Sequence, residues 1–352
     1  MPDWSKSMEQ SFEFYEVNPE SLADLKRLEN VKAASFNRDG ETDTLGSATI
    51  DITNSLGEMY MRGYLKTVQN GVDEKFPLGT VLAQTPSSSF NGTSLNISID
   101  AYTPLIELKE KRPPLGYSIR KGTNIMAAAY ALVKENTRVP VNGVENSKTL
   151  QLDFVANTSD TWLTFIIDLI ANADYELGLD ELGHILFLPK QEIESLQAVW
   201  TYNDDNSSIL YPELTLKHDL YGIPNVVEVV YSYGSKYQHV VVKNDDPNSP
   251  TSTVNRGREI VYRETDPKLA GYVSDDRLED YAERLLKELS TVEYSVSYTH
   301  AYCPVRVGDC VRLNYSKAGI NNVKAKVISQ NIKCVPGCPV SEKAVFTTKL
   351  WR

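Results

Sequence analysis

An alternation of apolar and polar side chains with a period of two is the feature that most limits how this chain folds. In "SATIDIT", Ala48, Ile50 and Ile52 alternate with polar residues, and "SLNISIDA" repeats the pattern from Leu95 to Ala101. Successive side chains of a strand point to opposite faces, so both segments predict half-buried strands with these apolar side chains inside. About four or five such strands between residues 31 and 102 predict a small antiparallel barrel or sandwich.

A second β-rich region begins at about Val199. Its segments "PNVVEVVYSY" and "AVFTTKLW" have the β-branched and aromatic residues that are typical of strands. "VRVGDCVRLNY" and "VKAKVISQNIK" follow each other closely and predict consecutive antiparallel partners. Tyr294, Tyr298 and Tyr302 lie on strand faces of this region, where amphipathic rings suit subunit contacts, with plain packing within the sheet as the alternative.

Helical patterns interrupt the β regions. The leucines of "PESLADLKRLEN" recur every three residues and predict a short capping helix in an N-terminal arm. "GTNIMAAAYALVKENTR", opened by a Thr123 cap, and "SDTWLTFIIDLIANADY", opened by Ser159 or Asp160, predict a pair of helices between the β regions. The second of these is apolar around most of its circumference, so we expect it to be buried. "SDDRLEDYAERLLKELS" predicts an amphipathic helix with a leucine stripe.

With 352 residues, the chain is longer than one typical domain, and the prolines of "KEKRPPLGY" mark a boundary. The predicted fold class is α+β, mainly β. The predicted parts are an N-terminal arm or helix at 1–29, a β domain at 30–108, an α/β insertion domain at 109–192, and a second β domain at 193–352 with an α/β insertion at about 236–290.

Charge and hydropathy exclude two classes of protein. The formal net charge of −11 argues against a general basic surface for nucleic acid, because that kind of binding neutralises phosphates with Lys and Arg. No apolar run is long enough to span a bilayer, and no signal peptide is recognisable. We therefore predict no membrane-spanning segment and synthesis in a reducing cytosol.

All the cysteines of the chain lie near its end, at Cys303, Cys310, Cys334 and Cys338. Converging thiolates could bind Zn²⁺ or an iron–sulfur cluster, although the gaps of six and three residues differ from the short pairs of a standard zinc finger. Disulfides formed after cell lysis and ordinary packed thiols are the alternatives. The spacing leaves all three hypotheses open.

Short catalytic motifs are absent from the sequence. The four histidines lack metalloprotease spacing, and neither a phosphate loop nor a hydrolase elbow occurs. Paired acids such as Asp245 with Asp246, or Asp275 with Asp276, lie in polar segments or at a helix start, where solvent or the helix dipole stabilises them. We therefore predict that the chain is not an enzyme.

The order of these elements resembles that of the baseplate hub or tail-tip hub proteins of tailed bacteriophages. The resemblance covers about residues 30–350 and includes the run from Tyr221 to Asn225 before a strand and the turn from Val307 to Asp309 before another. It implies two tail-tube-like antiparallel β-barrel domains with α/β insertions. Some related tail-tip proteins carry a cluster on four cysteines near the end of the hub, which implies a 4Fe-4S cluster or Zn on the four cysteines of this chain.

The resemblance also implies a function. Three copies would form a homotrimer whose six small β domains match a hexameric tail tube or a distal tail protein above and hold a central spike or fibre protein below. Such a symmetry adaptor is part of the virion tail tip, is assembled in the host cytoplasm, and lets DNA pass during ejection without specific binding. Closed rings of this kind also satisfy strand edges that would otherwise aggregate.

Other functions stay open at this point. A metal- or cluster-dependent enzyme built on the four cysteines would be a monomer with an open coordination position. A module that binds carbohydrate on the host surface would expose aromatic platforms. The negative charge of the chain would keep DNA from sticking to a channel wall, but it is also a common charge for solubility.

Overall fold

In the computed structural model, the chain is described at residues 2–53, 57–90, 92–93, 95–191, 193–205, 208–218, 220–233, 236–265, 267 and 274–350. It divides into two compact units, which are treated separately below. Unit 1 comprises Met1–Leu214 and Ser297–Ala344, and unit 2 comprises Thr215–Val296 and Val345–Arg352. The boundaries expected at residues 30, 109 and 193 stay predictions. No helix among the described residues is long and apolar enough to cross a membrane.

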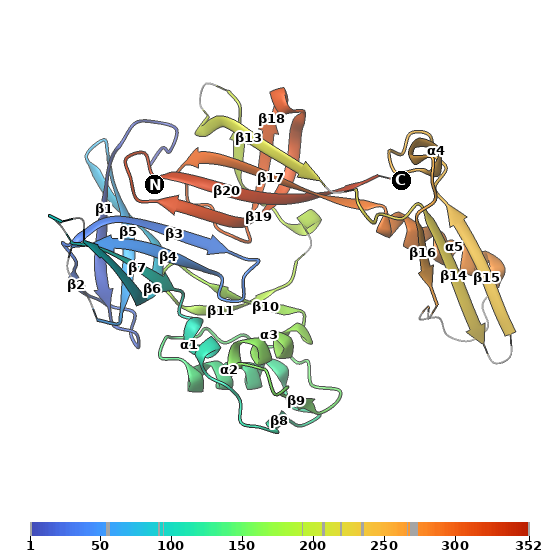
Figure 1. Ribbon diagram of the computed structural model, residues 1–352, viewed down its shortest axis with the longest axis horizontal. Helices are drawn as coiled ribbons and strands as arrows, with labels where there is room; N and C mark the ends of the chain where they lie inside the picture. The colour runs from blue at the N-terminus through green and yellow to red at the C-terminus, as the bar shows by residue number, and fades with distance from the viewer. Residues whose placement is uncertain are drawn as a thin grey trace. The chain divides into compact units, whose positions relative to one another are not determined.

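Most elements of unit 1 are strands (Figure 1). Its strands are β1 (Glu9–Val17), β2 (Asp24–Arg27), β3 (Val31–Asp39), β4 (Gly46–Ile52), β5 (Met59–Gln69), β6 (Val72–Phe90), β7 (Leu95–Tyr102), β8 (Ser118–Ile119), β9 (Phe154–Val155), β10 (Tyr175–Leu179), β11 (Ile185–Pro189), β12 (Ala198–Asn203), β18 (Cys310–Tyr315) and β19 (Ile320–Lys333). Its helices are α1 (Ile106–Glu110), α2 (Ile125–Asn136) and α3 (Trp162–Ala171), with short 3₁₀ turns η1 (Ile193–Ser195) and η2 (Ser316–Ala318). Strands β13 (Leu210–His218), β17 (Thr291–Ala301) and β20 (Pro339–Lys349) have residues in both units.

One large sheet joins strands from both ends of the sequence. Its hydrogen-bonded order is β13-β17-β20-β19-β3-β4-β7-β6-β5-β1-β2, and β18 pairs with both β19 and β12. The pairs from β3 to β7 and from β18 to β19 are antiparallel, whereas β12 and β18 are parallel. The mainly β, antiparallel fold class is confirmed. Closure into the two expected barrels is not seen among the pairings of the described residues.

The alternation predicted from the sequence matches the burial of β4 and β7. Ala48, Ile50 and Ile52 are buried, with polar neighbours that are partly or fully exposed. In β7, Ile97 is buried, but Leu95 is exposed because it pairs with the exposed Phe90 at the turn end of the β6–β7 hairpin. The period of two therefore placed the core correctly and failed only where the hairpin extends beyond its packing partners.

The helix predicted over "PESLADLKRLEN" is wrong. The segment forms a tight turn followed by strand β2, which pairs with β1 at the edge of the large sheet. Leu22 adopts a positive φ of 54°, which ends any helix there, and its backbone N–H donates to the carbonyl oxygen of Asn18. Leu22 and Leu28 are buried while Leu25 is exposed. The three-residue spacing of the leucines therefore does not reflect one helical face. Leu22 and Leu28 are buried separately, in the turn and after β2.

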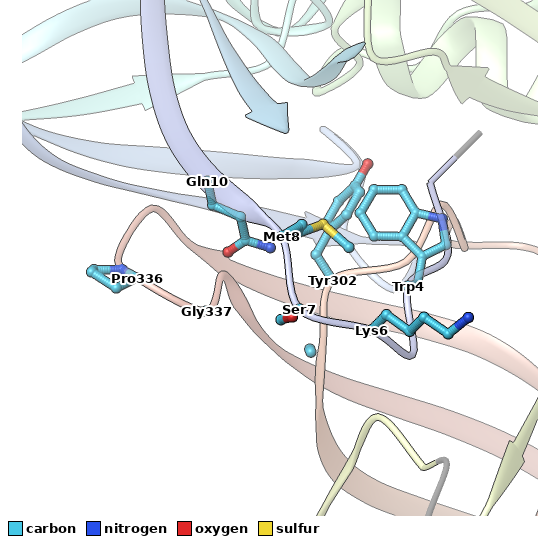
Figure 2. Close-up of a pocket in the computed structure, with 9 residues that line it drawn as sticks. Trp4, Lys6, Ser7, Met8, Gln10, Tyr302, Pro336 and Gly337 are labelled. Atoms are coloured by element: carbon cyan, nitrogen blue, oxygen red, sulfur yellow. The ribbon is translucent and has the colours of Figure 1, made fainter. Parts of the chain in front are cut away.

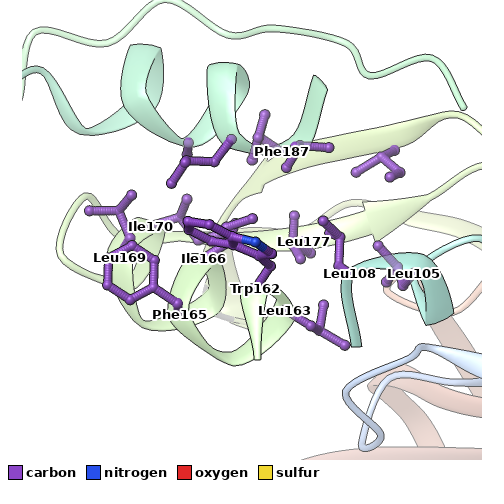
Figure 3. Close-up of a cluster of buried hydrophobic side chains, with 14 of the residues drawn as sticks. Leu105, Leu108, Trp162, Leu163, Phe165, Ile166, Leu169, Ile170, Leu177 and Phe187 are labelled. Carbon is purple, nitrogen blue, oxygen red and sulfur yellow. The ribbon is translucent and has the colours of Figure 1, made fainter. Parts of the chain in front are cut away.

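The helices of the insertion pack around a hydrophobic core (Figure 3), and this core also includes Val17, Leu22, Tyr60 and Leu82 from the first β region. The expectation that the second helix is buried is confirmed: Figure 3 shows Trp162, Phe165 and Ile166 of α3 facing the interior. The predicted caps are wrong by one or two residues. Asn124, not Thr123, caps α2, and Thr161 caps α3 through a reciprocal capping box with the residue three positions on.

In unit 2, the described residues include a short three-stranded sheet and two helices. Its elements are β14 (Val226–Tyr233), β15 (Lys236–Lys243), α4 (Thr253–Arg256), β16 (Val261–Glu264) and α5 (Asp275–Leu289). Strand β14 lies between antiparallel β15 and parallel β16. The predicted leucine stripe is confirmed, since Leu278, Ala282 and Leu286 of α5 pack on the β14 side chains Val227 and Val229.

Two facing glycines make room for an aromatic ring in the large sheet, and this generates a first prediction. Gly63 pairs with Gly79 across β5 and β6, and a Cβ at Gly63 would lie 2.5 Å from the buried ring of Phe36. We expect Gly63→Ala to lower the free energy of unfolding by about 1–3 kcal/mol in urea titrations, because the packed ring must move. Gly57→Ala, where an added Cβ meets no atom within 4 Å, is the matched control. Equal stabilities of the two variants would contradict this packing.

Candidate functional site

The place where the two β regions meet is the best-defined feature of unit 1. Strand β3 from the first region pairs antiparallel with β19 from the second, over residues 35–39 and 329–333. The Gly40 N–H donates to the Ile328 carbonyl at 2.8 Å, and the Cys334 N–H donates to the Ala34 carbonyl at 2.9 Å, which extends the contact at both ends. Each region thereby satisfies a strand edge of the other, and neither edge is left open for aggregation.

A carboxylate from the insertion, Glu181, forms ion pairs with both β regions. Glu181 lies in the turn between β10 and β11 and is 9% exposed. Its Oε1 is 3.4 Å from a guanidinium nitrogen of Arg38 on β3 and 2.8 Å from Nε of Arg306, which precedes β18. Arg38 also donates to the carbonyl oxygen of Leu78 at 2.8 Å. A largely buried acid with cations on two sides favours a single placement of the insertion.

A second buried cation, Arg62, also contacts the turn between β10 and β11. Arg62, only 3% exposed, pairs with Asp24 at 2.8 Å and donates to the Thr80 hydroxyl at 2.7 Å. Its other nitrogen donates to the carbonyl oxygens of Leu22 at 3.0 Å and Leu182 at 2.7 Å. Every donor direction of the guanidinium is thus used, which offsets the cost of burying its charge. Arg62 links the N-terminal turn, the sheet and the insertion.

A buried polar network joins side chains of β17, β19 and β20. His300 on β17 and Glu342 on β20 are fully buried, with His300 Nε2 3.3 Å from Glu342 Oε2. Gln330 donates to the same oxygen at 2.6 Å, and the Tyr298 hydroxyl donates to the other carboxylate oxygen. Arg38 donates to the Gln330 amide oxygen at 3.2 Å, so the network is continuous with the β3 cation. The seam between the β regions therefore has one connected set of charges and hydrogen bonds.

The surroundings of His300 shift its protonation. Burial lowers its pKa, but hydrogen bonds to Cys303 and Glu342, together with the negative charge of Glu342, outweigh burial and raise the pKa to about 10. Burial, and then the Glu342 carboxylate, raise the pKa of Tyr298 well above its usual value. At neutral pH the network therefore contains an imidazolium beside the Glu342 carboxylate and neutral tyrosines.

The four predicted site cysteines are spread over this region as free thiols. Cys303 contacts the Tyr202 hydroxyl at 3.3 Å, and Cys310 begins β18 with its sulfur near the carbonyl oxygen of Val311. Cys334 and Cys338 lie in the turn between β19 and β20, where Cys338 has a positive φ of 39°. Cys338 contributes to the raised pKa of Cys334 through the repulsion between their charged forms, after burial.

The four-cysteine metal or cluster site stays a prediction. Among the described residues, which include all four cysteines, no group of three or more His, Cys, Asp or Glu side chains could hold a metal ion. Burial raises the pKa of Cys338 to about 12 in the metal-free chain. A bound metal ion itself deprotonates a coordinating thiol, so this value does not argue against a metal site. Four irons per chain in anaerobically purified protein would support a 4Fe-4S cluster on these cysteines, and one zinc per chain would support a Zn site.

A cleft of about 310 Å³ lies where the N-terminal residues meet the "CVPGC" turn (Figure 2). Figure 2 shows Trp4 beside Tyr302, and their ring centroids are 5.3 Å apart. Trp4 also packs edge-on against Phe76 at 5.0 Å. These contacts attach the start of the chain to the large sheet.

Two of the three tyrosines considered for subunit contacts are buried inside unit 1. Tyr298 and Tyr302, expected at subunit contacts, are 4% and 5% exposed and pack inside unit 1, so the alternative of plain packing is correct for both. Tyr294 stacks between His218 and Phe346 in unit 2.

Sequence reasoning also missed the charged residues of the seam. A signal for Arg62 was present, because "MYMRGYL" places one cation within a β-rich, largely apolar stretch. Glu181 and Glu342 carry no comparable signal, since their partners are distant in sequence.

Comparison with known proteins identifies the fold. No protein-family model matches the sequence, and no curated protein is significantly similar to it. A tail protein from Neisseria meningitidis is structurally similar, with a TM-score of 0.63 and 12% identity over 97% of this chain and 98% of that one. The 43 kDa tail protein of prophage MuSo2 from Shewanella oneidensis has a TM-score of 0.60 and 9% identity over 96% and 98%. The chain has the fold of phage tail proteins along nearly its whole length.

The raised pKa of His300 predicts how stability depends on pH. The folded state holds this proton up to about pH 10, whereas the unfolded chain releases it near 6.5. The stabilisation is complete below pH 6.5 and is lost as pH rises toward 10, with a slope of up to about 1.4 kcal/mol per pH unit. Urea unfolding from pH 6.5 to 9 should show this fall, and His300→Gln should flatten it. The exposed His239→Gln is the control, and an unchanged slope in His300→Gln would refute the assignment.

Proposed function

We propose that this chain is a subunit of a homotrimeric tail hub that joins a hexameric tail tube, or a distal tail protein, to a central spike or fibre protein. The observation that carries the proposal is the edge-to-edge pairing of β3 with β19, which unites two β regions of one chain in a continuous sheet. The tail-protein fold supports a structural role in the tail.

Symmetry gives the proposal its physical basis. Three chains with two similar β regions each would present six β regions around an axis, which is the number needed to stack on a hexameric tube. Each β3–β19 pair would supply one of the junctions within that ring. Among the described residues, β2 and β13 end the hydrogen-bonded order of the sheet, so their outer edges are available for junctions between copies.

In this role the protein is an adaptor and not an enzyme. It belongs to the virion at the tail tip or baseplate, is assembled in the host cytoplasm, and lines the channel through which DNA leaves. The formal net charge of −11 suits a channel that DNA crosses without binding, because carboxylates repel phosphates. The seam charges around Glu181 and Arg62 would keep the rigid spacing that a symmetric ring requires.

The proposal predicts the mass and symmetry of the protein in solution. We expect light scattering coupled to size exclusion to give three times the chain mass of 39.4 kDa, because an adaptor of this kind has no function as a single copy. Electron micrographs of the same fraction should show threefold particles with six similar lobes in one layer. A strictly monomeric protein across a wide concentration range, or a ring of another order, would exclude the trimeric hub.

A further inference from the structure

Three aliphatic side chains are strongly exposed at one end of the helical insertion. Leu115 is 85% exposed, Leu152 is 75% exposed and Val155 is 57% exposed. Figure 1 shows strands β8 and β9 at the end of the insertion that is farther from the large sheet than α1. Single exposed aliphatics are ordinary on a protein surface, but three of them on and beside one short two-stranded ladder favour an interaction site.

Backbone pairing connects the segments that carry these side chains into one small frame, which here means the β8–β9 ladder and the turns beside it. Ser118 pairs with Val155 in the β8–β9 ladder, and the Ala156 N–H donates to the Tyr117 carbonyl at 2.9 Å. Leu115 lies in the turn that the Tyr117 N–H closes onto Pro114. On the other side, the Lys121 N–H donates to the Asp153 carboxylate at 2.7 Å, next to Leu152.

The frame is rigid, because its inner side belongs to the core of the insertion. Ile119 is buried in that core and Phe154 packs against it, with the Phe154 ring 5.0 Å from that of Phe165. The exposed side chains are therefore presented by fixed backbone and do not sit on a loose loop. A surface that is ordered before binding loses less conformational entropy when a partner docks.

Cations surround the same aliphatics. Arg112, Arg120 and Lys121 are exposed, and within the part of the chain that the structure describes no acid pairs with their side chains. Residues 109–156 hold eight Lys and Arg against four Asp and Glu, whereas the whole chain has a net charge of −11. Two of these cations, Arg138 and Lys148, pair with Glu107 and Asp174, and Asp153 is an exposed acid beside Leu152. The positive excess of the patch therefore rests on Arg112, Arg120 and Lys121.

We propose that this surface docks a different protein whose contact face is acidic and carries apolar side chains. The surface, named here the β8–β9 patch, consists of Leu115, Leu152, Val155, Arg112, Arg120 and Lys121. Unpaired cations attract and orient an acidic face, and the aliphatics lose their contact with water when it docks. The proposal does not depend on the trimeric hub.

Charge and composition favour such a protein over two other occupants. Contact of this patch with the same patch of a second copy would bring like charges together, which is unfavourable. Duplex DNA would use the cations, but it gains little from three exposed aliphatics, since nucleic-acid affinity comes mainly from phosphate neutralisation.

Fluorescence anisotropy with a short labelled peptide of alternating Glu and Leu residues tests the proposal on the full chain. We expect saturable binding that weakens as salt is raised, no binding of the matching Lys and Leu peptide, and weaker binding of a labelled DNA duplex. Leu115→Ser with Leu152→Ser, and separately Arg112→Glu with Arg120→Glu, should each weaken peptide binding by about tenfold.

Matched controls separate the patch from the rest of the surface. Val72→Ser removes an aliphatic that is 59% exposed, and Lys26→Glu reverses an exposed charge, both on other strands. Neither control should change peptide binding. All the substituted residues are exposed, and unchanged circular dichroism and melting temperature confirm that each variant folds. Failure of the peptide to bind, equal weakening by the controls, tighter binding of DNA, or a change of oligomeric mass in the leucine variant would each overturn the proposal.

Discussion

The pairing of β3 with β19 is the constraint on which the rest of unit 1 depends. It joins residues 35–39 to residues 329–333, and the same contact places Arg38 beside Gln330. From there, hydrogen bonds and ion pairs reach Glu342 on one side and Glu181 on the other. A single junction between strands therefore positions both β regions and the helical insertion.

Buried charges at this junction contribute more to placement than to stability. Removing Arg62 or Glu342 from water is costly, and the ion pairs and hydrogen bonds around them recover that cost only when all partners are in position. A small shift of the insertion would leave a charged group without partners. Apolar packing alone would tolerate such a shift with a smaller penalty, so the charged seam favours one arrangement.

Local patterns predicted much of the fold, because burial repeats with a short period. The inner face of β4 and the stripe of α5 followed directly from spacing. The turn at Leu22 was missed because its leucines anchor two different segments that meet only in three dimensions. The same limit applies to the seam: Glu181 and Arg306 are far apart in sequence, so no local pattern predicts that they pair.

The long sequence separation of β3 and β19 also has a consequence for biosynthesis. A ribosome adds about 5–20 residues per second, so β3 emerges on the order of half a minute before its partner strand exists. During that interval its edge is an open template for other chains. Nascent copies on one message are therefore exposed to mispairing with each other, and a cell making this protein in quantity has reason to shield the emerging strand with a chaperone.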